Sequence, residues 1–388
     1  MIRWNGNSRK VLGLIGLGTA AGWLAISPAL ADQSPSDQAQ PAGKVMAFAV
    51  TSMPYSLAKG ADDCPDGMVW SAKDIYLNSV SPAERKRLQL AENLKEFEQK
   101  AYHTTDGRDL CDALDYPRAP QISTKGKVSY GMDLDGTKDG HETETTCAHQ
   151  KFQGPDGGLV DNQTYRVFGC MSNYRGPPGE SGYLESLRNS GFRDGGTTIL
   201  IELMDVKDAR NDSDIRVGVY NGASPMVVDP SGDKFLPYAS LTMTGDKRYQ
   251  AVAHGRIVDG VVTTDPVDIR THYDEGGYQR DFNIKAARLR LQLLPNGNMK
   301  GMIAGYLDMP DVDMTPKGTK QASAEMVKYD CPSIYQAIRR YADGFKDPQT
   351  GKCTALSTAF DIEAIPAFVI HPEEAKKTAE ATSPTQTR

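Results

Sequence analysis

The sequence predicts a mainly β protein with an antiparallel, jelly-roll-like β-sandwich body and small disulfide-closed helical elements before and after it. Between about residues 123 and 310, short extended runs alternate with Gly, Asn, Asp and Pro, which is typical of sandwiches and barrels. The 37 Gly and 23 Pro also favour turns over long helices. Because no crossover helices separate the runs, we expect neighbouring strands to be antiparallel.

The composition narrows the class of protein. With 388 residues, 39% of them hydrophobic and 24% charged, the chain can bury a core. Its net charge of −6 offers no basic surface for a nucleic acid or an anionic membrane. After residue 31 no stretch reaches the 18 apolar residues of a membrane span, so no transmembrane helix and no nucleic-acid partner are expected.

Residues 1–31 have the features of a secretory signal peptide. Three basic residues lie in the first ten positions, an apolar stretch follows, and Ala29-Leu30-Ala31 matches an A-x-A cleavage site. We therefore expect a periplasmic or secreted protein. Residues 32–44, rich in Pro, Ser and Gln, are predicted to be a disordered linker.

Six cysteines follow the predicted cleavage site. An even number in an exported protein indicates disulfides, and six cysteines allow fifteen pairings. Pairing nearest neighbours closes three separate loops and predicts Cys64–Cys111, Cys147–Cys170 and Cys331–Cys353.

Residues 45–122 are predicted to be a mainly helical N-terminal region. Ser81-Pro82-Ala83-Glu84 forms a capping box with Pro at the first helical position. Apolar residues then recur at helical spacing, which predicts one buried face: Leu90, Leu94, Phe97 and Ala101.

Residues 123–310 are predicted to be the β-sandwich domain. Asn296-Gly297 is a strong hairpin signal and predicts a β-hairpin over Ala286–Leu307. Seven strands are expected at Lys127–Leu134, Thr164–Cys170, Thr197–Val206, Ile215–Tyr220, Gln250–Val258, Ala286–Leu294 and Met299–Leu307.

The remaining residues are divided into three parts. Residues 311–327 are a polar linker and 373–388 a disordered tail. Between them, 328–372 is predicted to be a C-terminal helical region, because apolar residues follow helical spacing as far as Gly344. These are Ile334, Ile338, Tyr341 and Phe345.

Two acidic turns make up the candidate metal site. Asp133, Asp135 and Asp139 occupy a Gly-containing turn, although their spacing differs from that of an EF-hand. Asp156 and Asp161 lie in a second turn, which a Cys147–Cys170 disulfide would fold back onto the first. Carboxylate oxygens are the ligands of Ca²⁺, so these five residues are candidate Ca²⁺ ligands. The alternative is that Asp-Gly sequences simply make tight turns.

A zinc site at His141, Cys147 and His149 is a weaker hypothesis. Cys and His are preferred ligands of zinc. However, a cysteine in an oxidising compartment is more readily disulfide-bonded, and the other histidines show no catalytic-triad spacing.

One enzymatic hypothesis rests on a carboxylate within an apolar run. Glu202 lies inside the strand predicted at Thr197–Val206, with Asp205 three residues further on. Glycoside hydrolysis needs two carboxylates that face one cleft, so Glu202 and Asp205 are candidate catalytic residues. An ideal pleat would put them on opposite faces, and Glu202 could instead point outward from the sheet.

These observations favour an exported, non-enzymatic protein that binds a ligand or a cell-envelope component, with Ca²⁺ as a candidate stabilising ion. A secreted hydrolase that acts on a glycan and a purely structural envelope protein remain as alternatives. The sequence identifies neither the ligand nor the oligomeric state.

Overall fold

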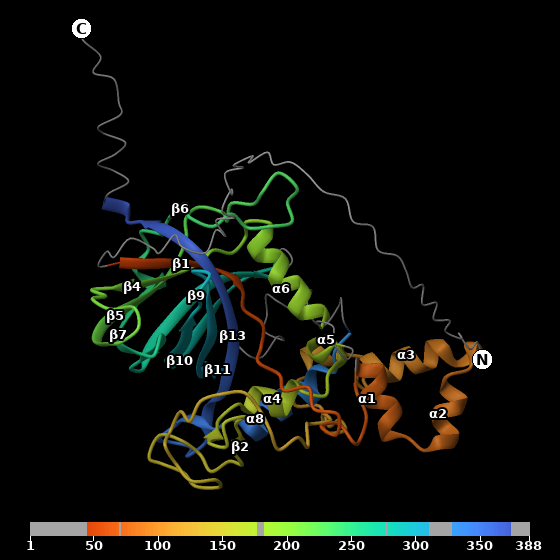
Figure 1. Ribbon diagram of the computed structural model, residues 1–388. Coiled ribbons are helices and arrows are strands. Elements are labelled where there is room, and N and C mark those ends of the chain that lie inside the picture. The colour runs from red at the N-terminus through yellow and green to blue at the C-terminus, as the bar shows by residue number, and fades with distance from the viewer. Residues whose placement is uncertain (1–44, 70, 177–181, 276–277, 310–327, 374–388) are drawn as a thin grey trace, which may run out of the picture. The chain divides into compact units, whose positions relative to one another are not determined.

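The structure is a computed structural model that describes residues 45–69, 71–176, 182–275, 278–309 and 328–373 (Figure 1). The predicted signal peptide 1–31, the linkers 32–44 and 311–327, and all of the tail 373–388 except Glu373 lie outside these residues. In the part of the chain that is described, no helix is long and apolar enough to cross a membrane.

One sheet of eleven strands dominates the molecule. The hydrogen-bonded path runs β1-β4-β5-β7-β8-β10-β11-β13-β12, with β9 paired to β10 and β6 paired to β13. All of these ladders are antiparallel except β6–β13, so a mainly β, antiparallel fold is confirmed. The strands are β1 (Val45–Ser52), β4 (Ile199–Met204), β5 (Asp212–Asn221), β6 (Ala239–Thr242), β7 (Gln250–Val258), β8 (Val261–Thr264), β9 (Val267–Glu275), β10 (Tyr278–Leu293), β11 (Met299–Asp308), β12 (Gly344–Lys346) and β13 (Cys353–Ile370).

The sheet closes on itself through β13, the long blue strand in Figure 1. Residues 355–364 of this strand pair with β11. Residues 363–367 pair with β1, which in turn pairs with β4 at the start of the path. Closure gives β1 a partner on both sides, whereas β6, β9 and β12 each pair with one strand only among the described residues. A sandwich of two packed layers stays a prediction.

The inner face of the sheet carries the main hydrophobic core. On β10, Leu289 and Leu291 face this core and are at most 1% exposed, whereas the alternating Arg290 is exposed. The strand predicted at Ala286–Leu294 is therefore confirmed, with one buried face and one face in contact with solvent. Helix α6 (Tyr183–Arg193) packs against β1 and β9 (Figure 1). Its Phe192 belongs to the same core. Burying each such side chain contributes about 1.5–3 kcal/mol.

The hairpin between β10 and β11 is also confirmed. Leu293 pairs with Met299 at its closed end. Between them, Gly297 has a φ of +83°, a conformation that side chains with a Cβ rarely adopt. The local Asn-Gly signal therefore sets the register of the two strands.

The helices lie outside the sheet and are short, but three of them, at 163–168, 172–175 and 183–193, fall within residues 123–310, which were predicted to be the β-sandwich domain. Ser81 caps α2, since its hydroxyl accepts the Glu84 amide at 3.3 Å. Phe97 and Ala101 pack in a separate small core as expected, but Leu90 and Leu94 are 45% and 48% exposed. The helices are α1 (Ala72–Ser79), α2 (Pro82–Leu88), α3 (Leu94–Tyr102), α4 (Gln163–Phe168), α5 (Ser172–Arg175), α6 and α8 (Cys331–Tyr341), with 3₁₀ turns at Ala91–Asn93, Leu110–Asp112 and Lys247–Tyr249.

Four secondary-structure predictions are wrong. β1 lies in residues 45–122, which were predicted to be mainly helical. β13 lies in residues 328–372, also predicted to be helical. Helix α8 in that region ends at Tyr341 rather than at Gly344. The strand predicted at Thr164–Cys170 is helix α4, and Lys127–Leu134 makes only isolated bridges. Every residue of α4 is buried, so it has no polar face to show a helical period.

The predicted disulfide pairing is wrong as well. The bonds are Cys64–Cys170, Cys111–Cys331 and Cys147–Cys353, which span 106, 220 and 206 residues. Each joins segments that the folded sheet brings together, and that proximity is not visible in cysteine spacing. Three disulfides fit a protein outside the reducing cytoplasm.

Removing Cys111–Cys331 with a double serine variant should lower the free energy of unfolding by about 2–5 kcal/mol, because the unfolded chain loses a long-range constraint. Urea denaturation without reductant measures this loss. Peptide mapping of the unreduced wild type should yield a Cys111–Cys331 cross-link. A Cys64–Cys111 cross-link would contradict the observed pairing.

Candidate functional site

A segment with little regular structure, residues 127–161, covers part of the outer face of the sheet; we call it the loop layer. Strands β2 (Phe152–Gln153) and β3 (Leu159–Val160) form a short ladder within it. Leu134 packs on outer-face residues of β11 and β13, including Tyr306 and Ala359. Leu134 therefore anchors the first acidic turn to the sheet, although Asp133 and Asp156 remain exposed to solvent.

The loop layer brings three of the five predicted Ca²⁺ ligands together around the side chain of Lys151. Its ammonium lies 2.5 Å from Asp133 Oδ1, 2.7 Å from Asp135 Oδ1 and 3.3 Å from Asp161 Oδ2. Burial lowers the pKa of Lys151, but its bonds to Asp133 and Asp135 raise it overall. Because a fully buried ammonium lies among these carboxylates, they do not fit a Ca²⁺ ion at the same point.

The other two predicted Ca²⁺ ligands lie apart from this cluster. Asp139 Oδ1 accepts the backbone N–H of Lys151 at 2.7 Å. The side chain of Asp156 is 63% exposed and lies 3.7 Å from Arg290. The five residues therefore do not form one cage of oxygen ligands.

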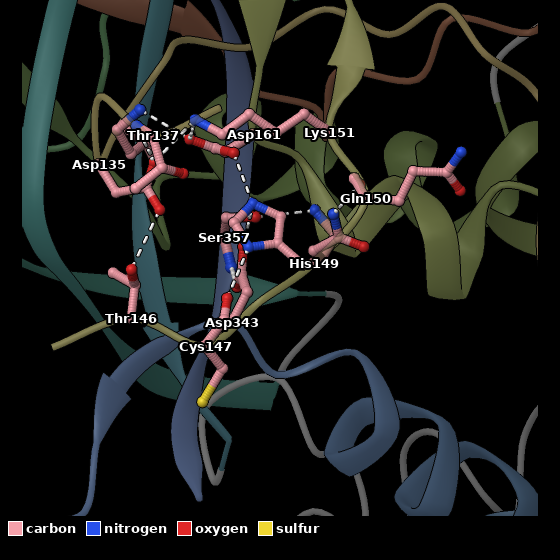
Figure 2. A network of polar contacts seen from close by, with 12 residues as sticks. Asp135, Thr137, Thr146, Cys147, His149, Gln150, Lys151, Asp161, Asp343 and Ser357 are labelled. Carbon is pink, nitrogen blue, oxygen red and sulfur yellow. Dashed lines mark hydrogen bonds and ion pairs between the residues drawn. The ribbon is translucent and has the colours of Figure 1, made fainter. Parts of the chain in front are cut away.

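On the other side of Asp161 lies His149, which the sequence placed in a zinc site with His141 and Cys147 rather than beside Asp161 and Asp343 (Figure 2). Its Nε2 is 2.7 Å from Asp161 Oδ1 and 3.6 Å from Asp343 Oδ2, while Nδ1 is 2.9 Å from the Cys147 carbonyl oxygen. Burial lowers the pKa of His149, but the bond to Asp161 and the charge of Asp343 outweigh it and raise the pKa to about 9.

Asp343 comes from the turn between α8 and β12 and is completely buried. Its Oδ1 accepts the backbone N–H of Ser357 at 2.7 Å. Burial raises the pKa of Asp343 to about 7, although the nearby His149 charge works in the opposite direction. The Cys147–Cys353 disulfide ties the His149 segment to the strand that carries Ser357.

The same disulfide excludes the predicted zinc site of His141, Cys147 and His149, since Cys147 has no free thiol and His141 is exposed.

Beside the loop layer, the outer face of β10, β11 and β13 forms a groove of about 670 Å³. Its floor contains charged side chains of both signs. Ser56 donates to Asp361 at 2.8 Å, and partial burial raises the pKa of Asp361. The lining residues are Tyr130, Gly131, Pro155, Asp156, Val160, Val261, Arg290, Gln292, Lys300, Gly301, Met302, Asp361, Ile362 and Glu363.

No known protein family, curated protein or solved structure matches this chain.

The two candidate catalytic carboxylates do not form a pair. Glu202 is 3% exposed and lies on the outer face of β4, where His371 Nε2 approaches its Oε2 at 3.1 Å. Asp205 follows the end of β4, is half-exposed and binds Arg216 at 2.7 Å. Different partners therefore hold the two carboxylates.

A second pocket, of about 610 Å³, contains the side chains of His272 and Tyr249. His272 Nδ1 lies 3.0 Å from Asp281, which also accepts the Tyr249 hydroxyl and Arg270. Burial raises the pKa of Asp281, but its bonds to His272, Arg270 and Tyr249 lower it overall. An ionised Asp281 keeps the proton of His272 on Nδ1 and leaves Nε2 as the basic nitrogen.

The contribution of Asp135 to stability should depend on pH. Burial raises its pKa, but the bonds from Lys151 and Thr137 outweigh this and lower it to about 2, below the ordinary value of about 3.9. The folded state therefore favours the ionised form. Its stabilisation is complete above about pH 4 and is lost as the pH falls toward 2.

Urea denaturation of Asp135→Asn against the wild type measures this dependence. The variant should be less stable by about 2 kcal/mol at pH 7, and the difference should shrink between pH 4 and pH 2. Asp156→Asn, an exposed carboxylate of the same loop layer, is the control and should show a small, constant effect. A difference for Asp135→Asn that is independent of pH would contradict the expectation.

Proposed function

We propose that this chain is an exported binding protein, periplasmic or secreted, whose groove on β10, β11 and β13 takes a small peptide-like ligand with both amino and carboxylate groups. The observation that carries the proposal is the alternation of cationic and anionic side chains on an open floor. The groove volume lies within the roughly 300–1,000 Å³ of small-molecule sites.

The strand register supports this ligand class, because it arranges the floor in two cross-strand rows. One row contains Gln292, Lys300 and Glu363 in adjacent positions. The other contains Arg290, Met302 and Asp361, so each row contains one cation and one anion. Directly opposite side chains in a sheet have Cβ atoms roughly 4.5–5.5 Å apart, which matches the short spacing of charges on a small peptide.

Lys300 and Glu363 are open to a ligand. Both side chains are exposed, and neither has a hydrogen bond or an ion pair with any residue of the described ranges. At the wall of the groove, Tyr130 is 43% exposed and offers an aromatic face to an apolar part of the ligand. A ligand can therefore be held by charges on the floor and by an aromatic contact at the side.

Export is supported by two independent features. Residues 1–31 match a signal peptide, and all six cysteines are paired. Ca²⁺ does not enter this proposal, because Lys151 supplies the positive charge among the acidic turns.

Isothermal titration calorimetry with a panel of unblocked di- and tripeptides tests the groove. Lys300→Gln and Glu363→Gln should each weaken binding about tenfold or more, since a charge-assisted hydrogen bond contributes about 1.5–3 kcal/mol. The matched controls are Lys86→Gln and Glu92→Gln, two exposed charges outside the groove, which should bind as the wild type does. Absence of binding across the panel, or equal affinities for all variants, would contradict the proposal.

A hydrolase is the second candidate function, and the geometry favours His272 rather than Glu202 as its base. The bond to Asp281 orients His272, while Nε2 has no partner among the described residues. Such a histidine can accept a proton from a substrate or a water molecule.

Turnover of a panel of chromogenic esters and glycosides tests this candidate. His272→Gln should abolish turnover, whereas His254→Gln, an exposed histidine on β7, should leave it unchanged. A wild type that turns over no member of the panel would argue against the enzyme.

A further inference from the structure

We propose that His149, Asp161 and Asp343 bind one divalent transition-metal ion in the layer between the sheet and the loop layer. Zn²⁺ is the ion whose preferred ligands these residues match. This inference is independent of the groove.

The three ligand atoms already converge. One ligand atom from each of His149, Asp161 and Asp343 lies within 4.8 Å of the other two. Nε2 is 2.7 Å from the first oxygen and 3.6 Å from the second. Ligands at about 2.0–2.2 Å from a tetrahedral zinc ion are separated by roughly 3.3 Å, so small shifts would admit the ion.

A backbone group holds the opposite end of each of these side chains (Figure 2). His149 Nδ1 faces the Cys147 carbonyl oxygen at 2.9 Å, and Asp161 Oδ2 accepts the Leu134 amide at 2.8 Å. The Ser357 amide donates to Asp343 Oδ1 at 2.7 Å. These contacts leave one nitrogen and two oxygens directed at a common point. In metal sites, hydrogen bonds from neighbouring groups orient the ligand side chains in the same way.

Two buried polar atoms at this place have no hydrogen-bond partner among the described residues. They are Asp343 Oδ2 and the hydroxyl of Tyr306, whose residues are 0% and 4% exposed. Tyr306 pairs with Ser357 across β11 and β13, and burial, followed by the charges of Asp343 and Asp161, raises the pKa of its hydroxyl. A buried polar group without a hydrogen bond destabilises the folded state, and a bound ion would give Asp343 Oδ2 a closer partner than His149 Nε2, which lies 3.6 Å away.

The charges also call for a divalent cation. Asp135, Asp161 and Asp343 have side chains at most 3% exposed, and Lys151 is the buried ammonium among them. Metal binding displaces the proton of His149, after which the three carboxylates and Lys151 leave two negative charges that one divalent ion balances. A nitrogen ligand favours zinc and similar metals over Ca²⁺, which prefers oxygen alone.

The competing interpretation is a metal-free ion pair, in which a protonated His149 is held between the two carboxylates. The two interpretations differ in their response to a chelator. An ion pair is unaffected by EDTA, whereas a metal site loses its ion and with it the stabilisation of the native state.

The first experiment uses the full mature protein with its disulfides intact. Elemental analysis should find about one metal ion per chain, or one Zn²⁺ should bind after treatment with EDTA. Zn²⁺ should raise Tm, and Ca²⁺ should not. X-ray absorption of the zinc form should show nitrogen and oxygen ligands at about 2.0–2.2 Å and no sulfur.

Variants locate the ion. Asp343→Asn and His149→Gln should each weaken Zn²⁺ binding by more than roughly 10–100-fold, the loss typical of removing a residue that only hydrogen-bonds to a metal ligand. His141→Gln and Asp156→Asn, exposed residues of the same loop layer, should bind Zn²⁺ as the wild type does. If Asp343→Asn does not fold, the X-ray absorption of the wild type still tests the ligand set.

Two outcomes would overturn the proposal. One is a wild type that holds no metal and shows the same Tm with EDTA and with Zn²⁺. The other is binding that survives in His149→Gln but is lost in His141→Gln, since this would assign the ion to the surface.

Discussion

The pairing of β13 with both β11 and β1 is the constraint on which the rest of the structure depends. It closes the sheet, so that the apolar faces of the strands can enclose one core. The same strand bears Cys353 and Ser357, which hold the loop layer, and Asp361 and Glu363, which form the groove floor. Without this pairing, neither candidate site would be assembled.

The loop layer is attached to the sheet by a different kind of interaction. A small apolar contact around Leu134 is supplemented by the disulfide Cys147–Cys353 and by the buried charges of Lys151, Asp161 and Asp343. Removing buried charges from water is costly and is offset only where the partners are well placed. The arrangement therefore favours one position of the loop layer over all others.

The groove and the buried histidine cluster share this layer. Tyr130 forms part of the groove wall, and the adjacent Gly131 packs so closely on Asp161 that a Cβ would lie 2.6 Å from its carbonyl oxygen. Asp161 in turn contacts both Lys151 and His149. The position of the groove wall at Tyr130 is thus coupled by direct contacts to the buried charged cluster around Asp161.

The sequence by itself determined what depends on neighbouring residues. The Asn296-Gly297 hairpin, the Ser81 cap and the alternation along β10 follow from local backbone preferences and periodicity, and the acidic turns were visible as a concentration of carboxylates. Only the tertiary structure decided the disulfide partners, the ammonium of Lys151 among the carboxylates, and the approach of Asp343 to His149. Asp343 and Cys353 reach the loop layer only because the closed sheet brings distant segments together, and no local pattern encodes that proximity.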